Sequence, residues 1–567
     1  MRARFVGPAA AGGRAPLLAA GGLALLLAVA YLLAPPMGTD LSAQVARAAF
    51  VARYGAAPID LGWYGGTVQY GYSLLTPGLM ALLGVGPTGA LALVVSALAF
   101  AGLLTRTDAV RPMLGGLLGA ACIAGNLVSG RTTYAVGVAF GLLALLALTA
   151  SRQWVRLAGG AAGALLASAA SPVAGLFVGL GAVALLASAR FGDRGGARDA
   201  TGAGSAPAGR TSVPAGVTSL GTAGPASAPS TGSGAAALLV AVAAAVPLAV
   251  NALLFGEGGW MNISRADLVH AVVASLAVAV VVRRPPVRIG AVLSAAGVLA
   301  AFAVHTPVGL NATRLATMFA LPVVAAYAEP LRWGRPGRSP GLVLAAALVA
   351  LAAWQPPVNL GDLRDAGNPT AQRSYFAPLR AELDRRQPVG RIEVPPTRDY
   401  WEAAYATPVA RGWLRQVDLA RNRLFFDGGL TADRYQAWLA DNGVRYVAVA
   451  DAEPSWVGRS EVKLVRGGLP YLSEVWRGGH WVLYEVAGEP AVVDGATLIG
   501  STNGALTIDV EHPGTALVRL RWSRWLTVDG PAPATLAATG RWTTLDTTVP
   551  GRYTVSSGLV SDRRPRE

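Results

Sequence analysis

Long runs of apolar residues recur through the first 355 residues of this 567-residue chain, and they constrain its fold more than any other feature. A helix needs about 20 apolar residues to cross the hydrocarbon core of a bilayer, and fewer where short helices pack inside a bundle. Runs of this kind lie near residues 15–34, 88–105, 112–129, 132–150, 157–170, 172–189, 235–254, 268–282, 289–304, 312–328 and 340–354. Because 53% of the residues are hydrophobic and only 14% are charged, we predict a polytopic α-helical membrane protein with about eleven transmembrane helices.

The arginines between these runs predict how the helices are oriented. Lys and Arg together number 47, against 32 Asp and Glu, an excess that would suggest nucleic acid in a soluble protein. Here the arginines stand in short clusters on alternate connections between the apolar runs, a pattern typical of cytoplasmic loops. We therefore predict no nucleic-acid partner. The clusters are Arg106 and Arg111, Arg152 and Arg156, Arg190, Arg194 and Arg198, Arg283, Arg284 and Arg288, and Arg332, Arg335 and Arg338.

Two further expectations follow from this orientation. The segment "YSLLTPGLMALLGV", 72–85, contains Pro77 and must not cross if the arginines alternate, so we expect an interfacial helix on the outer face. Arg2, Arg4 and Arg14 precede the first run, which we interpret as a retained signal anchor with a cytoplasmic N-terminus. The chain is therefore expected in the plasma membrane, with its C-terminal region extracytoplasmic.

Composition divides the chain further. The transmembrane domain, 1–355, includes a first outer loop at 35–87, and its segment 192–234 has too few large apolar residues to bury a core, so a disordered cytoplasmic loop is predicted. Residues 356–488 indicate an α/β domain. Within it, "TADRYQAWLADNGVRYVAVA", 431–450, predicts a helix capped by Thr431, stopped by Gly443 and followed by a buried strand. Residues 489–567 alternate apolar and polar residues around turn signals and predict a β-rich terminal unit.

Polar residues of the membrane half gather on the predicted outer face. Ionisable groups at membrane depth are costly and usually face a cavity or a partner, so this gathering predicts a site. Its members are Asp40, Gln44, Asp60, Trp63, Tyr64, Tyr70 and Tyr72 in the first outer loop, Asn126 and Arg131 at the second with Tyr134 just beyond, Ser171 and Pro172 at the third, Glu257, Trp260, Asn262, Arg265 and Asp267 in the fourth, and His305, Asn311 and Arg314 in the fifth.

The two acids of the first outer loop each allow two interpretations. Asp40, in "PPMGTD", either caps the amphipathic segment "LSAQVARAAFVARYG" or acts as a catalytic base or ligand. Asp60, before "LGWYGG", either forms a turn or supplies a second carboxylate. Together they would allow a divalent cation, although two acids about twenty residues apart are weak evidence for one. The single cysteine, Cys122, permits no internal disulfide.

The other candidates are substrate contacts or ordinary interfacial residues. Arginines on the outer face are unusual without an anion to meet, which favours phosphate binding over snorkelling to the headgroups. Histidine and asparagine at helix ends are often satisfied interfacial residues, and aromatic side chains either stack on a sugar or form a headgroup belt. The candidates are Arg314, Arg131, His305, Asn311, Tyr64, Tyr70 and Trp260.

This arrangement resembles the GT-C superfamily of membrane glycosyltransferases, which have an acid soon after the first helix, interfacial helices and often an outer C-terminal domain. The matching acid is Asp40 in "GTDLSAQ", and "HTPVGLNATRL", 305–315, looks like the late outer loop whose arginine, here Arg314, approaches a lipid phosphate. Family members often carry two neighbouring acids, whereas this chain has one, so either Asp60 supplies the second or catalysis is lost. The outer region, with "WLADNGVRYVAVA" and "RWLTVDG", is similar to YfhO-type bacterial membrane proteins.

The resemblance implies transfer of a sugar from a polyprenyl-phosphate donor to an envelope glycan or lipid acceptor, with inversion. Actinobacterial relatives suggest arabinose or mannose. Arg314 would stabilise the phosphate charge that develops on the leaving group, and Asp40 would accept the acceptor's proton. No dinucleotide fingerprint or P-loop spacing indicates a nucleotide donor. The alternatives are a major-facilitator-like transporter and a non-catalytic protein of envelope assembly.

Overall fold

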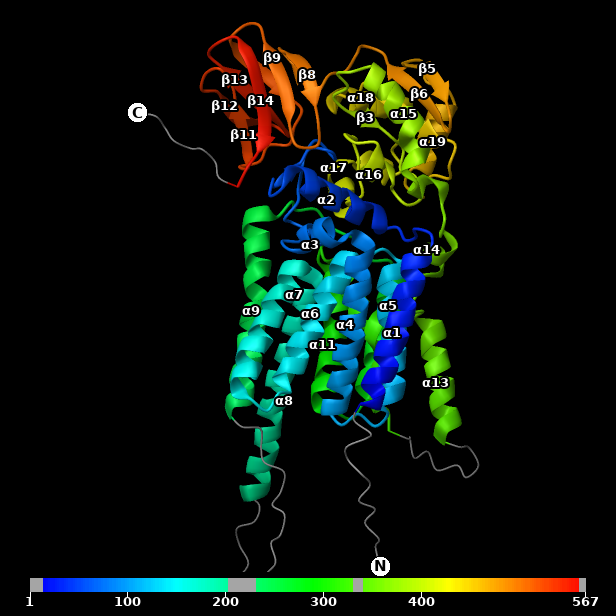
Figure 1. Cartoon of the computed structure of the whole chain (residues 1–567), viewed down its shortest axis with the longest axis vertical. Helices are drawn as coiled ribbons and strands as arrows, with labels where there is room; N and C mark the ends of the chain where they lie inside the picture. The colour runs from blue at the N-terminus through cyan, green and yellow to red at the C-terminus, as the bar shows by residue number, and fades with distance from the viewer. Residues whose placement is uncertain (1–13, 202–230, 330–339, 560–567) are drawn as a thin grey trace, which may run out of the picture.

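The fold consists of a helical bundle with two smaller units stacked on one of its ends (Figure 1). The computed structural model describes residues 14–201, 231–329 and 340–559. Most of the segment expected to be a disordered loop, 202–230, lies outside these ranges, while its first residues continue a helix to Thr201.

The bundle contains a helix at each of the eleven positions where an apolar run is found. The helices are α1 (Ala15–Leu33), α4 (Val85–Arg106), α5 (Pro112–Val128), α6 (Thr132–Leu148), η1 with α7 (Val155–Gly159, Gly160–Ala170), α8 (Pro172–Thr201), α9 (Thr231–Phe255), α10 (Arg265–Val281), α11 (Pro285–Ala303), η2 with α12 (Gly309–Thr313, Arg314–Tyr327) and α13 (Pro340–Trp354). Six of the described helical segments are long and apolar enough to cross a membrane by length and composition, and four further apolar helices are shorter. Large apolar side chains such as Leu33 and Val280 face outward from the bundle. The chain is a multi-pass membrane protein.

Small residues let the bundle helices approach closely. A Cβ atom added at Gly163 would lie 2.9 Å from the backbone and side chain of Ala144, and one at Gly115 would lie 2.5 Å from the Cβ of Ala326. Such contacts are typical of membrane helices, where small side chains permit backbone packing in place of a hydrophobic driving force.

The two ends of the bundle carry different connections. At one end, the connections that carry arginine clusters contact one another. Arg284 Nη2 donates to the Asp108 carbonyl at 2.9 Å, and Arg111 Nη1 donates to the Ala328 carbonyl at 2.6 Å. At the other end α2 (Leu41–Tyr54) and α3 (Thr76–Leu83) lie between the bundle and the C-terminal units (Figure 1). Residues 72–85 thus contain a short helix at that end, in the region where an interfacial helix was expected.

The first C-terminal unit is an α/β fold around a four-stranded sheet. Its strand order is β3 (Ile392–Glu393), β4 (Tyr446–Ala450), β6 (Trp481–Val486) and β5 (Leu472–Gly478), with β3 and β4 parallel and the other pairs antiparallel. Helices α14 (Leu360–Arg364), α15 (Arg373–Arg385), α16 (Glu402–Tyr405), α17 (Arg415–Arg421), α18 (Ala432–Asp441) and α19 (Arg459–Arg466), with the short 3-10 turns η3 (Pro369–Ala371) and η4 (Arg423–Phe425), complete the unit.

The helix and strand predicted over 431–450 are confirmed. The Thr431 side chain caps α18 by accepting from the Arg434 backbone N–H, Gly443 follows the helix with a positive φ of 63°, and every residue of β4 is buried. Thr431 thereby satisfies an orphan N–H, and Gly443 adopts a backbone conformation that a side chain would strain.

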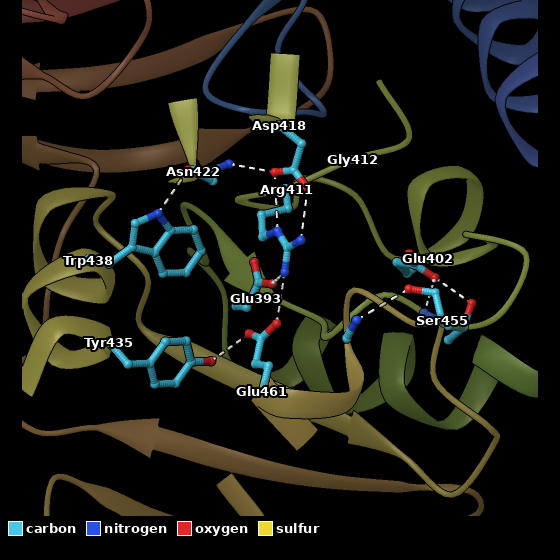
Figure 2. Close-up of polar contacts among 12 residues, drawn as sticks. Glu393, Glu402, Arg411, Gly412, Asp418, Asn422, Tyr435, Trp438, Ser455 and Glu461 are labelled. Atoms are coloured by element: carbon cyan, nitrogen blue, oxygen red, sulfur yellow. Dashed lines mark hydrogen bonds and ion pairs between the residues drawn. The ribbon is translucent and has the colours of Figure 1, made fainter. Parts of the chain in front are cut away.

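An ionic cluster lies in the core of the α/β unit (Figure 2). The Arg411 guanidinium donates to both Asp418 oxygens at 3.2 and 2.8 Å and to Glu461 at 2.9 Å, and Glu393 lies 3.9 Å away. Tyr435 donates to Glu461 at 2.8 Å. Three carboxylates surround one arginine, and all four side chains are at most 5% exposed.

The terminal unit packs two antiparallel four-stranded sheets into a sandwich. Their orders are β12-β13-β10-β7 and β11-β14-β9-β8, formed by β7 (Val493–Asp494), β8 (Thr497–Ser501), β9 (Leu506–Val510), β10 (Gly514–Val518), β11 (Leu526–Asp529), β12 (Thr535–Thr539), β13 (Trp542–Thr547) and β14 (Gly551–Ser557). Alternating burial along β9 and β13 agrees with the period-two pattern of the sequence. The expected fold class, a helical membrane bundle followed by a β-rich region, is confirmed at this level.

The first loop after α1 joins the C-terminal units to the bundle. It forms the short antiparallel pair β1 (Ile59–Asp60) and β2 (Thr67–Val68). Trp63 Nε1 donates to the Ala403 carbonyl at 2.8 Å, and Tyr64 donates its hydroxyl proton to Gly412 at 2.6 Å. These buried contacts fix the α/β unit over the end of the bundle.

Candidate functional site

A large cavity lies between the bundle and the α/β unit, on the side where polar residues were predicted to gather. Its volume is about 980 Å³. The bundle contributes Asp40, Asn126, Arg131, Ser171, Asn311 and Arg314, and the α/β unit contributes Arg398, Tyr400, Trp413, Arg415, Trp456 and Arg459. Both the membrane part and the C-terminal part of the chain therefore form this cavity.

Asp40 lies between two arginines in the wall of this cavity. Its Oδ2 is 3.3 Å from Arg131 Nε and 3.6 Å from Arg314 Nη2. Asp40 stands at the N-cap position of α2, yet its side chain makes no capping hydrogen bond. The capping interpretation of Asp40 is therefore wrong for this side chain, which binds arginines instead.

Two glycines bring Asp40 and Arg131 together. Gly38 and Gly130 have positive φ angles of 96° and 72°. A Cβ atom at Gly38 would lie 2.3 Å from the Ser129 backbone, and one at Gly130 would lie 2.4 Å from the Leu41 backbone nitrogen. The turn before α2 thus contacts the turn between α5 and α6, which only glycine allows at these positions.

The side chains of Asp40, Arg131 and Arg314 together leave one net positive charge at this part of the cavity wall. Two guanidiniums face one carboxylate, and the Arg314 guanidinium also lies 5.0 Å from the centre of the Tyr134 ring. Helices α2 and α6 begin at Leu41 and Thr132, directly after Asp40 and Arg131, so two helix N-termini add partial positive charge beside Asp40. This arrangement fits an anion such as a phosphate.

The opposite wall offers aromatic and cationic side chains. Trp456 is 56% exposed, and the Arg415 guanidinium lies 4.8 Å from its ring centre. Arg398 is already paired, at 2.8 Å with Asp365 and 2.6 Å with Glu453. An exposed indole beside a cation is suited to stacking against the face of a sugar ring.

Asp60 lies elsewhere in the loop. It is 1% exposed, accepts hydrogen bonds from the Gly62 backbone N–H at 2.8 Å and from Gln69 Nε2 at 2.9 Å, and does not line the large cavity. Burial raises the pKa of its carboxyl to about 7. These contacts agree with the turn-forming interpretation of Asp60.

Asp40 and Asp60 are not both in the cavity, so the structure does not bring together the two acids considered for a divalent cation. Among the described residues, no group of three or more His, Cys, Asp and Glu side chains is arranged to hold a metal ion.

Four other candidates are also outside the lining of the large cavity. Tyr64 is buried beneath the α/β unit, and Tyr70 packs on Phe255 with ring centres 5.1 Å apart. Trp260 and His305 contact each other edge to face at 4.5 Å. Of the candidates, Asp40, Arg131, Arg314 and Asn311 line the cavity, whereas Asp60, Tyr64, Tyr70, Trp260 and His305 do not.

The α/β side of the cavity was not anticipated from the sequence. Arg415 and Trp456 lie in a region that reads as an ordinary soluble domain, and nothing in their local pattern distinguishes them from surface residues. Contacts between residues more than 300 positions apart bring this wall over Asp40, among them those of Trp63 and Tyr64 and the hydrogen bond from Trp413 Nε1 to the Thr39 carbonyl at 2.8 Å.

Comparison with known proteins gives structural likeness alone. No protein-family model and no curated protein matches the chain. A cryo-EM structure of the arabinofuranosyltransferase AftD from Mycobacteria aligns with 97% of this chain and 58% of its own, at 16% identity and a TM-score of 0.45. A mutant form of AftD aligns with 96% of this chain and 60% of its own, at 15% identity and a TM-score of 0.43. The chain thus spans less than two thirds of the AftD structures, and the function proposed below rests on the geometry of the cavity.

Proposed function

We propose that this chain is a membrane glycosyltransferase of the GT-C type, which transfers a sugar from a polyprenyl-phosphate donor to a hydroxyl of an envelope glycan or lipid. The observation that carries the proposal is the position of Asp40 between Arg131 and Arg314, in the wall of a cavity shared by the bundle and the α/β unit. A lipid-linked donor enters such a cavity from the bilayer, and a soluble glycan enters it from the other side.

Charge balance supports a phosphodiester donor. A polyprenyl-phosphate sugar carries one negative charge, so the donor and the Asp40 carboxylate together match the two guanidiniums. The donor phosphate would compete with Asp40 for hydrogen bonds from Arg131 and Arg314. Asp40 would then be free to accept a proton from the acceptor hydroxyl.

The proposed transfer step forms one bond at the anomeric carbon and breaks another. The acceptor oxygen attacks the anomeric carbon as its proton moves to Asp40, and the bond from that carbon to the phosphate oxygen breaks. The released polyprenyl phosphate gains a negative charge next to Arg131 and Arg314, which stabilise it. Direct displacement by the acceptor inverts the anomeric configuration.

Two features support this proposal over transport. Transporter sites usually lie near the middle of the membrane between related halves, whereas this cavity lies at one end of the bundle and takes much of its wall from the α/β unit. The arginine-bearing connections lie at the opposite end, which favours an extracytoplasmic location for the cavity and the C-terminal units.

The test is transfer by the full-length protein in proteoliposomes supplied with polyprenyl-phosphate sugars and an envelope-glycan acceptor. We expect Asp40→Asn to lower kcat about 10²- to 10⁴-fold, as loss of a general base does, without loss of donor binding. Asp427→Asn is the matched control, because Asp427 is an exposed acid of the α/β unit that pairs with Arg434 at 3.5 Å. Normal transfer by Asp40→Asn would remove Asp40 from the mechanism.

A further inference from the structure

The β-sandwich lies next to the end of α9 (Figure 1). Residues of both parts line a second, smaller cavity at this junction. Its volume is about 260 Å³, and it does not share lining residues with the large cavity. Trp525 joins the two parts: its Nε1 donates to the Leu254 carbonyl at 3.1 Å, and its ring stacks on Phe255 at 5.3 Å. The cavity is therefore fixed at the surface end of a membrane helix.

This second cavity is rich in uncompensated positive charge. Arg421, Arg521 and Arg524 line it, together with one acid, Glu257. Glu257 lies 4.0 Å from Arg421 and accepts the Val68 backbone N–H at 2.5 Å. Within the described part of the chain, no carboxylate lies within 4.0 Å of the Arg521 or Arg524 guanidinium.

Contacts other than an ion pair hold Arg521 in place among the described residues. Its Nε donates to the Tyr64 carbonyl at 3.4 Å, and its guanidinium lies 4.2 Å from the centre of the Trp542 ring. Burial, with the repulsion of nearby arginines such as Arg421, lowers its pKa to about 9. An anion in the cavity would relieve this repulsion.

The rim of the cavity is apolar on the membrane side. Leu253 and Leu254 near the end of α9 are 74% and 41% exposed, and Trp522 on the sandwich is 47% exposed. Leucines that point outward from a membrane helix meet acyl chains, and tryptophan is favoured at the headgroup level. Cationic groups thus lie directly above an acyl-facing surface.

We propose that this cavity binds the phosphate headgroup of an anionic membrane lipid. Arg521 and Arg524 face the phosphate, Leu253 and Leu254 contact the acyl chains, and Trp522 lies among the headgroups. Basic pockets beside membrane helices recognise lipid phosphates in this way. The bound lipid holds the β-sandwich on the bilayer and is distinct from any substrate at Asp40.

The experiment measures lipid binding to the full-length protein in detergent by native mass spectrometry. The probes are phosphatidylglycerol, phosphatidylcholine and inorganic phosphate, at equal concentrations. We expect selective retention of phosphatidylglycerol, and Arg524→Gln should weaken its binding about fivefold, as loss of one cationic contact with an anionic surface does. Arg524 is exposed, so this variant leaves the core intact, and Arg524→Lys should retain most of the binding.

The matched control is Arg552→Gln, an exposed arginine of β14 in the same sandwich that does not line the cavity. It should bind phosphatidylglycerol like the unchanged protein. Equal weakening by Arg552→Gln and Arg524→Gln, or equal binding of the two lipids, would overturn the proposal. Inorganic phosphate that displaces phosphatidylglycerol at equal concentration would show that the site takes a soluble anion and not a lipid.

Discussion

The Arg411 cluster of the α/β unit and the Asp40 cluster of the large cavity use the same chemical groups in opposite proportions. Arg411 is surrounded by Asp418, Glu461 and Glu393 (Figure 2), and its side chain is only 1% exposed. Asp40 is one carboxylate facing two arginines, and its cluster opens onto a cavity of about 980 Å³.

This difference separates a cluster whose charges the protein itself meets from a cluster that leaves a positive charge at a cavity. In the closed cluster the protein supplies every partner of the arginine, so the excess negative charge must be met by protons. In the open cluster the excess is positive and accessible, so a ligand can supply the missing anion. A strongly charged buried group alone therefore does not indicate a site, whereas unmatched charge at a cavity does.

Replacement of Arg411 should have the largest effect. In Arg411→Met the buried acids lose the one guanidinium that they surround, and breaking a buried pair from one side costs about 3–5 kcal/mol of unfolding free energy. We expect the α/β unit to become protease-sensitive and its thermal midpoint to fall. Arg434→Met, which removes an exposed arginine paired with Asp427, is the control and should leave the midpoint nearly unchanged. Equal midpoints for the two variants would contradict the structural role of Arg411.

Opposite changes in phosphate affinity are expected at the Asp40 cluster. Arg314→Gln should weaken binding of dodecyl phosphate about tenfold or more, because a hydrogen bond to a charged group contributes roughly 1.5–3 kcal/mol. Asp40→Asn should strengthen it, because the two arginines lose their competing carboxylate. Thermal stabilisation of each variant by dodecyl phosphate measures both effects. Weaker binding in Asp40→Asn would show that Asp40 positions the arginines more than it competes with the ligand.

The sequence predicted the open cluster better than the closed one. Asp40, Arg131 and Arg314 each stand where an apolar run ends or begins, so the topology alone predicts that they share one end of the bundle. Asp60 and Tyr64 belong to the same predicted outer loop as Asp40, yet the α/β unit covers them through contacts that no local pattern encodes. The partners of Arg411 come from β3, α17 and α19, which only tertiary packing brings together.

The buried acids of the α/β unit should make its stability depend on pH. Burial raises the pKa values of Glu393 and Glu461, and it raises that of Glu402 to about 8. An acid with a raised pKa in the folded state binds its proton more tightly there than when unfolded. The free energy of unfolding should therefore fall as pH rises from about 4.5 to about 8, by at most about 1.4 kcal/mol per pH unit for each such proton.

Glu402→Gln should make the free energy of unfolding fall less steeply as pH rises. Thermal unfolding midpoints measured between pH 5 and pH 8 would reveal the change. Glu382 should have the opposite pH dependence and serves as a control. Hydrogen bonds from Arg385, and to a smaller extent from Arg386, lower its pKa. Its contribution is present at neutral pH and is lost as pH falls through its folded-state pKa. A stability profile that rises from pH 5 to pH 8 in the unchanged protein would show that the buried acids are not protonated.

The smallest expected effect is at the wall of the cavity opposite Asp40. Trp456→Ala should raise the acceptor KM about two- to tenfold, because aromatic contacts contribute roughly 0.5–1.5 kcal/mol beyond area burial, and should leave kcat and dodecyl phosphate binding unchanged. Trp154→Ala is the control, since Trp154 is 64% exposed and lies outside both cavities. If Trp456→Ala changed phosphate affinity but not the acceptor KM, the exposed indole would belong with the donor, and the two walls of the cavity would not divide donor from acceptor.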